Sequence, residues 1–198
     1  MYAKISEDFR GEISYNQKKG RPRGRKAGLA MRLFVAVLFS PELRQLLLDA
    51  QDELRAQSRA ANFTRPENLH LTLAFLGETP RARDAAKAVA SLTDAPFPLA
   101  LGRSGRFSDL WWIGVEPNPA LETLAAALNR NLRAAGFALE DRPFRPHVTI
   151  AREVDADGSP CLTPRRAEMT VSRVSLMKSE RIGGKLVYTE IAAKTLGK

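Results

Sequence analysis

The sequence predicts an α+β fold with two pseudo-symmetric lobes, each a mainly antiparallel sheet backed by helices. Three observations support this prediction: an internal repeat, an amphipathic helical pattern in each repeat, and short apolar strands that flank these helices. The chain has 198 residues, of which 44% are hydrophobic and 27% charged, so it is long enough to bury a core. We expect residues 31–198 to form a single bilobal domain, with an active-site cleft between the lobes.

The repeat is anchored by the two histidines of the chain. An offset of 77 residues lays His70 onto His147 without a gap. Each histidine is followed two positions later by threonine, at Thr72 and Thr149. A single His-x-Thr would be a weak signal, whereas a matched pair at equivalent positions indicates a shared role.

Each repeat unit begins with an apolar strand, at 33–39 and at 110–115, and a proline-marked break follows. An amphipathic helix comes next, and the His-x-Thr strand closes the unit. The apolar positions at helical spacing are Leu43, Leu46, Leu47, Ala50 and Leu54 in the first unit, and Leu121, Leu124, Leu128 and Leu132 in the second.

The remaining elements differ between the two halves. Residues 82–92 have a helical pattern, and residues 97–107 read as a strand that leads into a glycine-rich turn. Residues 168–180 and 184–196 alternate as two strands around a turn at Gly183-Gly184.

Strand alternation predicts which side chains face the cleft. His70 and Thr72 share one face of their strand, and the apolar residues Leu69, Leu71, Leu73 and Phe75 share the other. The same parity groups Arg145 with His147 and Thr149, and Val148 with Ile150 and Arg152. If an approximate two-fold axis relates the lobes, the two His-Thr pairs face each other.

Two opposed imidazoles suit acid–base chemistry on a phosphodiester. Histidine exchanges a proton near neutral pH, so one ring can act as acid and the other as base. The hydroxyls of Thr72 and Thr149 and the guanidinium of Arg145 would donate hydrogen bonds to the anion. Each residue also has a purely structural interpretation. The histidines could be core residues satisfied by hydrogen bonds, although their duplication argues against this. The threonines could simply favour strands, and Arg145 could be a surface cation.

Metal-dependent and nucleotide-driven chemistry are not indicated. Two histidines and one distant cysteine fall short of a zinc site, and the chain has no Walker-type phosphate loop. Of the neighbouring Trp111 and Trp112, at least one should lie in the core, and the other could stack on a nucleic-acid base.

The net charge of +9 is concentrated near the N-terminus. Residues 1–30 contain eight Lys or Arg and three acidic residues, without apolar periodicity, so we expect a disordered basic extension. A basic protein suits a polyanion such as RNA, although a solvated basic surface is an equal alternative. A signal peptide at 29–39 is a weaker interpretation, because Arg32 interrupts the apolar run.

The single cysteine bears on the cellular compartment. Cys161 cannot form an internal disulfide, so we expect an inert thiol in a reducing, cytoplasmic compartment. No apolar run approaches the roughly 18 residues that span a bilayer, so we expect no membrane contact.

These motifs resemble the two-histidine (2H) phosphoesterases, and within them the RNA 2′,3′-cyclic phosphodiesterases, also called 2′-5′ RNA ligases. The resemblance covers Met31 to Leu196 and is carried by "MRLFVAV", "NLHLTLAFLGE", "LWWIGV", "RPHVTIAR" and "SLMKSE…GGKLVYTEIAAKTL". It implies a metal-independent hydrolase without a cofactor, which opens a terminal 2′,3′-cyclic phosphate of RNA to a 2′-phosphate.

The resemblance also implies roles for the matched residues. His70 would be the proton donor, His147 the proton acceptor, and Thr72 and Thr149 the phosphate ligands. The expected partners are RNA with 2′,3′-cyclic phosphate ends or small cyclic nucleotides, and we expect a monomer. Two alternatives remain: joining of RNA ends through a 2′-5′ linkage, and a non-catalytic RNA-binding module.

Overall fold

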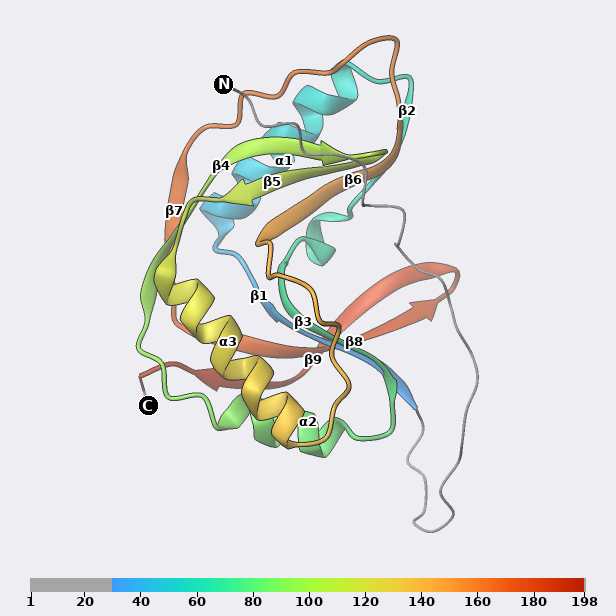
Figure 1. Cartoon of the computed structure of the whole chain (residues 1–198). Helices are drawn as coiled ribbons and strands as arrows, with labels where there is room; N and C mark the ends of the chain where they lie inside the picture. Colours follow the sequence, from blue (N-terminus) through green and yellow to red (C-terminus); the bar gives the residue numbers. More distant parts are fainter. Residues whose placement is uncertain (1–29, 198) are drawn as a thin grey trace.

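The computed structural model describes residues 30–197, which form nine strands and three α-helices (Figure 1). The expected extension at 1–30 falls almost wholly outside these residues. The strands are β1 (Met31–Val37), β2 (Ala60–Phe63), β3 (Leu71–Thr79), β4 (Phe97–Phe107), β5 (Leu110–Val115), β6 (His147–Asp155), β7 (Ala167–Val171), β8 (Arg173–Ile182) and β9 (Lys185–Thr195). The helices are α1 (Pro41–Ala56), α2 (Ala82–Ala90) and α3 (Pro119–Ala134), with a 3-10 turn, η1, at Pro66–Asn68.

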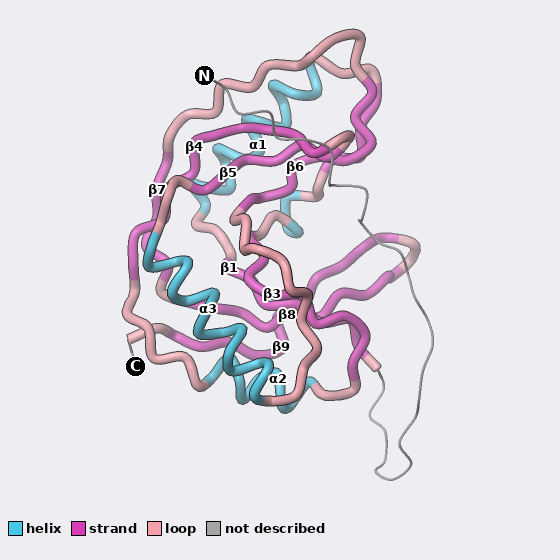
Figure 2. Tube along the Cα trace, in the orientation of Figure 1, coloured by secondary structure: helices cyan, strands magenta, loops and turns pink. Residues whose placement is uncertain are grey.

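The strands form two antiparallel sheets (Figure 2). Sheet A has the order β3-β1-β8-β9, and sheet B has the order β2-β6-β5-β4-β7. In both sheets the His-x-Thr strand, β3 or β6, pairs with the apolar strand that opens its repeat unit, β1 or β5. The predicted α+β architecture with two antiparallel sheets is confirmed.

One predicted strand was wrong in detail, and one strand was missed. The segment 168–180 is not one strand but two, because the chain leaves sheet B after β7 and enters sheet A with β8. The short edge strand β2 was not predicted. The apolar run considered as a signal peptide instead supplies β1, which lies between β3 and β8. The predicted turn is a two-residue hairpin with positive φ at Gly183 and Gly184.

The helices begin with matched capping signals. The side chain of Ser40 accepts a hydrogen bond from the backbone N–H of Leu43, and Asn118 accepts one from Leu121. A proline occupies the first turn in both helices. Side-chain caps of this kind stabilise a helix start by about 1 kcal/mol.

Each of these helices packs on the sheet of the other repeat unit. Helix α1 follows β1 of sheet A but contacts β6 and β7 of sheet B. Helix α3 follows β5 of sheet B and contacts β3 of sheet A and α2 more extensively than it contacts β4 of its own sheet. Figure 1 shows α1 beside the strands of sheet B and the pair α2 and α3 beside sheet A. The two lobes are therefore interlocked.

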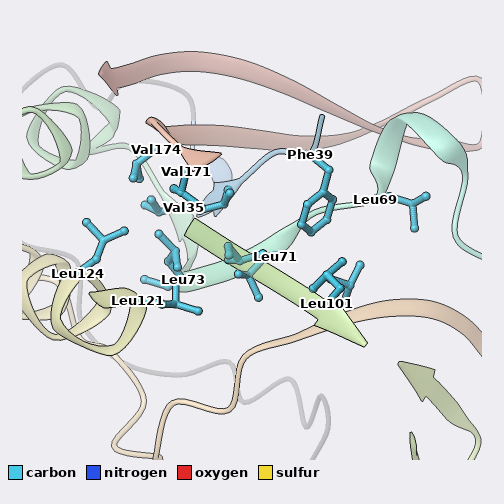
Figure 3. Close-up of a cluster of buried hydrophobic side chains, with 14 of the residues drawn as sticks. Val35, Phe39, Leu69, Leu71, Leu73, Leu101, Leu121, Leu124, Val171 and Val174 are labelled. Atoms are coloured by element: carbon cyan, nitrogen blue, oxygen red, sulfur yellow. The ribbon is translucent and has the colours of Figure 1, made fainter. Parts of the chain in front are cut away.

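One contiguous apolar core joins both sheets and all three helices. Side chains from β1, β3, β4, β8 and α3 meet in it, among them Val35, Leu71, Leu101, Val174 and Leu124 (Figure 3). A second, small cluster of Phe34, Ala36 and Met177 lies on the opposite face of sheet A. Continuity of the core fixes the positions of the two His-x-Thr strands relative to each other.

The two His-x-Thr strands carry an irregularity at the same place. In β3 an extra residue, Leu73, interrupts the register with β1, and in β6 the equivalent Ile150 interrupts the register with β5. In a β-bulge two successive side chains lie on one face, and here Leu73 and Ala74 are both buried, as are Ile150 and Ala151. Parity is therefore inverted beyond the bulge.

The inversion corrects the predicted facing of two residues. Phe75 was assigned to the apolar core face, but its side chain is 46% exposed. Arg152 was assigned to the face of Val148 and is also exposed. Both residues follow the bulge and return to the face that carries the histidine and threonine of their strand.

A buried glutamine of α1 holds the bulge of β6. The side-chain amide of Gln51 is buried and donates 2.7 Å hydrogen bonds to the carbonyls of both Ile150 and Thr64. The backbone N–H of Thr64 also donates to the Ile150 carbonyl, at 2.9 Å. The polar groups freed by the bulge thus find partners in α1 and in the segment after β2.

We predict that Gln51→Leu lowers the free energy of unfolding by about 1–3 kcal/mol, because it leaves the Thr64 carbonyl without this partner. Urea denaturation measures the change. The control is Gln45→Leu on the exposed face of the same helix, where about 0.5 kcal/mol or less is expected. Equal effects of the two substitutions would contradict the role of Gln51.

Candidate active site

Both histidines are oriented by the same hydrogen bond. Nδ1 of His70 lies 2.6 Å from the carbonyl oxygen of Asn68, and Nδ1 of His147 lies 2.8 Å from that of Arg145. A carbonyl oxygen only accepts, so Nδ1 donates in both rings. Nε2 is then the atom that gains or loses the exchangeable proton, and both rings present it away from their own backbone.

His70 lies among aromatic rings on sheet A. Its ring centroid is 4.8 Å from that of Phe34 and 5.2 Å from that of Tyr188, whose edge meets it at 89°. Asn68 supports this arrangement: its side-chain amide donates to the Leu186 carbonyl at 3.0 Å and so ties η1 to β9, the strand of Tyr188. The ring of His70 is therefore held on several sides.

The environment shifts the proton equilibrium of His70. Burial lowers its pKa from the ordinary 6.5, the hydrogen bond to the Asn68 carbonyl opposes this, and the charge of His147 lowers it further. The last effect requires the two imidazoles to lie within electrostatic reach, and β3 and β6 are in contact. The structure therefore brings together the two histidines that the repeat predicted.

His147 lies beside aromatic residues of sheet B. The ring centroid of Phe107 is 5.8 Å from that of His147 and 5.3 Å from that of Trp112. Trp112 lies over Gly105 of β4, where a Cβ atom would come within 2.2 Å of the indole. Trp111 is buried in the core, as predicted for one of the two tryptophans.

The threonines occupy the positions that strand parity predicted. Thr72 is exposed and Thr149 is half-buried, each on the face of its own histidine. In the strand registers Thr72 lies opposite Ala36, and Thr149 lies opposite Trp112. Both hydroxyls can thus approach a group held between the imidazoles.

Arg145 does not follow the strand parity, because it precedes β6. The structure shows its carbonyl positioning His147 and its side chain exposed. Its place in the repeat matches Asn68, 77 residues earlier, whose carbonyl does the same for His70. The part of Arg145 that the structure connects to the site is its backbone.

Arg152 is the cation that the sequence analysis missed. Burial raises the pKa of the Tyr188 hydroxyl, and the charges of Arg152 and Arg32 oppose that rise. Arg152 of sheet B is therefore within electrostatic reach of the tyrosine that contacts His70 in sheet A. The sequence did contain a signal for this residue. Strand parity put Arg152 on the apolar face with Val148 and Ile150, and a cation buried there would be costly, so its exposure could have been inferred.

The residues 30–197 contain no group of three or more His, Cys, Asp or Glu placed to hold a metal ion. Cys161 is exposed. Within the same range, none of the helices combines the length and apolar character that crossing a bilayer requires.

Two interlocked antiparallel sheets thus present a pair of His-x-Thr motifs with the Nδ1 atoms of both rings bonded to carbonyls, an arrangement typical of a two-histidine phosphoesterase. The chain belongs to the 2′-5′ RNA ligase superfamily, whose family model matches residues 42–183.

Similar proteins carry a consistent description. The chain is 33% identical over 129 residues to an RNA 2′,3′-cyclic phosphodiesterase of Geobacillus stearothermophilus, a match that covers 61% of this chain and 41% of that protein. It is 30% identical over 170 residues to the protein of the same description from Escherichia coli, covering 81% of this chain and 93% of the relative. The crystal structure of Escherichia coli LigT complexed with 3′-AMP is similar with a TM-score of 0.74 and 26% identity, over 86% of this chain and 100% of LigT.

We predict that His70 titrates below pH 6.5 in the free protein, because burial and the charge of His147 both favour its neutral form. With two histidines in the chain, NMR titration of the imidazole Cε1–Hε1 signals measures this directly. His147→Asn removes the neighbouring charge and should raise the pKa of His70. A His70 pKa at or above 6.5, unchanged by His147→Asn, would exclude the coupling.

Proposed function

We propose that this protein is an RNA 2′,3′-cyclic phosphodiesterase that hydrolyses a terminal cyclic phosphate to a 2′-phosphate. The observation that carries the proposal is the matched orientation of the two histidines, whose Nδ1 atoms are both fixed by carbonyls. The names of the relatives and the family membership support the substrate class. The ribose 2′-oxygen belongs to the reacting ring, so a DNA end cannot form this substrate.

The reaction balances with two imidazoles and one water. His147, neutral at Nε2, takes a proton from water as the water oxygen bonds to phosphorus. The bond from phosphorus to the 3′-oxygen breaks, and His70 gives its Nε2 proton to that oxygen. The products are a 2′-phosphate and a free 3′-hydroxyl, and exchange with solvent restores the starting protonation states.

The acid role of His70 depends on the substrate. In the unliganded site its pKa is lowered, which favours the neutral ring. A phosphodiester anion bound beside His70 stabilises the protonated form of that ring. Substrate binding thus supplies a charge that favours the protonated His70 required of the acid.

Hydrogen-bond donors for the phosphate come from both sheets. Thr72 and Thr149 provide hydroxyls on the histidine faces, and Arg152 provides a guanidinium on the same side of β6. We also assign Arg145 to phosphate binding, because its side chain is exposed two residues before His147. Hydrogen bonds to a charged oxygen contribute about 1.5–3 kcal/mol each.

The proposal also covers the oligomeric state and the cellular compartment. Both histidines and both threonines belong to one chain, so a monomer is sufficient. The single cysteine fits a reducing compartment, and we assign the protein to the cytoplasm. RNA ends and small 2′,3′-cyclic nucleotides are both substrates in this proposal.

The activity is tested by incubating the protein with a nucleoside 2′,3′-cyclic phosphate in a chelator and identifying the product isomer. We expect the 2′-phosphate and no requirement for a divalent ion. His70→Ala and His147→Ala should each lower kcat about 10²–10⁴-fold, and the double variant should lose far less than the product of the two losses. Circular dichroism of each variant controls for folding. If folded His70→Ala and His147→Ala both keep near-native turnover, the histidines are structural.

The order of acid and base is tested with a substrate whose bridging 3′-oxygen is replaced by sulfur. A thiolate leaves without protonation, since thiols have a pKa of about 8.5, so the acid becomes dispensable. We expect His70→Ala to recover most of its turnover on this substrate, while His147→Ala stays impaired. The opposite pattern would assign the acid role to His147.

A further inference from the structure

Tyr188 of β9 carries a polar group that the chemistry described above does not use. Its side chain is half-buried, and its ring packs against those of Phe34 and His70, with centroids 4.8 Å and 5.2 Å away. Within residues 30–197 its hydroxyl forms no hydrogen bond, and the oxygen is accessible to solvent. A tyrosine hydroxyl can both donate and accept, so this one is available to a ligand.

The ring of Tyr188 lies on the catalytic face of sheet A. Arg32 of β1 pairs in register with Ser179 of β8, and Ser179 pairs with Tyr188, so the three side chains form one row across the sheet. Phe34 follows Arg32 by two positions and therefore points to the same side. Its ring contacts both Tyr188 and His70. The phenol and the proposed acid thus lie over the small apolar cluster of this face.

The position of Tyr188 relative to His70 is fixed through one buried residue. The carbonyl of Asn68 accepts a hydrogen bond from Nδ1 of His70, and its side-chain amide donates to the carbonyl of Leu186, two residues before Tyr188. The turn η1 and strand β9 are also in contact. The hydroxyl is therefore in place before a substrate arrives, and its hydrogen bond requires little reorganisation.

The charges around the hydroxyl suit an anion. Arg32 of sheet A and Arg152 of sheet B both favour the ionised phenol, but burial raises the pKa of Tyr188 more strongly than they lower it. The hydroxyl therefore stays protonated over the pH range in which the histidines exchange protons. It is a hydrogen-bond donor within electrostatic reach of cations from both sheets.

We propose that the Tyr188 hydroxyl donates a hydrogen bond to a non-bridging oxygen of the terminal phosphate, on the His70 side of the site. This inference rests on the proposed function and adds a donor from β9 to the two threonine hydroxyls. The accepting oxygen gains negative charge as water adds to phosphorus, so the hydrogen bond strengthens during the reaction.

The test is Tyr188→Phe, which keeps the ring and removes only the hydroxyl. We expect kcat/KM for a nucleoside 2′,3′-cyclic phosphate to fall about 10- to 100-fold, as for a lost hydrogen bond to a charged group. Inhibition by the product, a nucleoside 2′-phosphate, should weaken by at least about 10-fold, and inhibition by the unphosphorylated nucleoside should not change. Unchanged turnover and product inhibition would overturn the inference, as would equal weakening by the nucleoside.

The pH dependence separates a direct contact from an effect through His70. A donor that stays protonated contributes equally between about pH 5 and 8, so Tyr188→Phe should lower the profile of kcat/KM without moving it. Tyr188→Leu removes the ring, so it should expose His70, raise its pKa and move the limb that reports His70 to higher pH. A profile shifted by Tyr188→Phe itself would mean that the hydroxyl acts through His70, against the proposal.

Thr189→Val is the matched control, because it removes an exposed hydroxyl from the other face of β9. It should change neither turnover nor inhibition. A wild-type protein without turnover would refute the proposed function alone, and binding of the nucleoside 2′-phosphate, followed by the imidazole NMR signals, would still test Tyr188. Weaker binding by Tyr188→Phe would then support the contact, equal binding would overturn it, and a wild-type protein that binds no 2′-phosphate would overturn both proposals.

Discussion

The site depends on a β-bulge repeated in the two His-x-Thr strands. In a strand that alternates strictly, Ala74 and Ala151 would face the same side as the histidines, and Phe75 and Arg152 would face the core. The extra residue at Leu73 and at Ile150 lets two successive side chains stay buried, and then exposes Phe75 and Arg152 beside the catalytic face. The bulge therefore keeps Ala74 and Ala151 in the core and puts Phe75 and Arg152 on the face of the histidine and threonine.

The bulge of β6 is stabilised from a distance, and this links the fold to the site. Gln51, which binds the bulged Ile150, belongs to α1, and α1 follows β1 of the other sheet. The geometry around Thr149 and Arg152 therefore depends on the crossing of a helix from one repeat unit to the other. An independent pair of lobes could not supply this contact, so the interlocked arrangement is part of the active-site architecture as well as of the core.

Local patterns in the sequence predicted most of the elements, and they failed where sheet membership decided the structure. Apolar periodicity located β1, β5 and the helices, because that periodicity reflects burial on one side. It could not separate β7 from β8. The two strands are divided only by Ser172, where the chain passes from sheet B to sheet A, and the local sequence does not mark this change. It also could not reveal that α1 crosses to sheet B, because an amphipathic helix records that one face is buried but not the sheet that buries it.

Sequence reasoning found the residues of the candidate site that occur in both repeat units and missed those that occur in one unit only. The two histidines and two threonines are equivalent in the repeat, so their likeness marked them. Tyr188 and Phe34 approach His70 from β9 and β1, two other strands of sheet A, and this long-range arrangement is not encoded in any local pattern. Arg152 was missed because strict alternation was applied across a bulge. Phe75 and Arg152 occupy equivalent positions in the repeat, and an arginine on a supposed core face already argued against strict alternation.

The two histidines are equivalent in the repeat but lie in unequal surroundings. Identical carbonyl contacts give both rings the same tautomer, so by themselves they would make the rings interchangeable. Burial beside Phe34 and Tyr188 lowers the pKa of His70 and favours its neutral ring, so the proposed acid role of His70 depends on the charge of the bound substrate. The same pair can by microscopic reversibility join a ribose hydroxyl to a cyclic phosphate, which is the ligation alternative. Water at its bulk concentration outcompetes a 5′-hydroxyl unless a site holds that second RNA end.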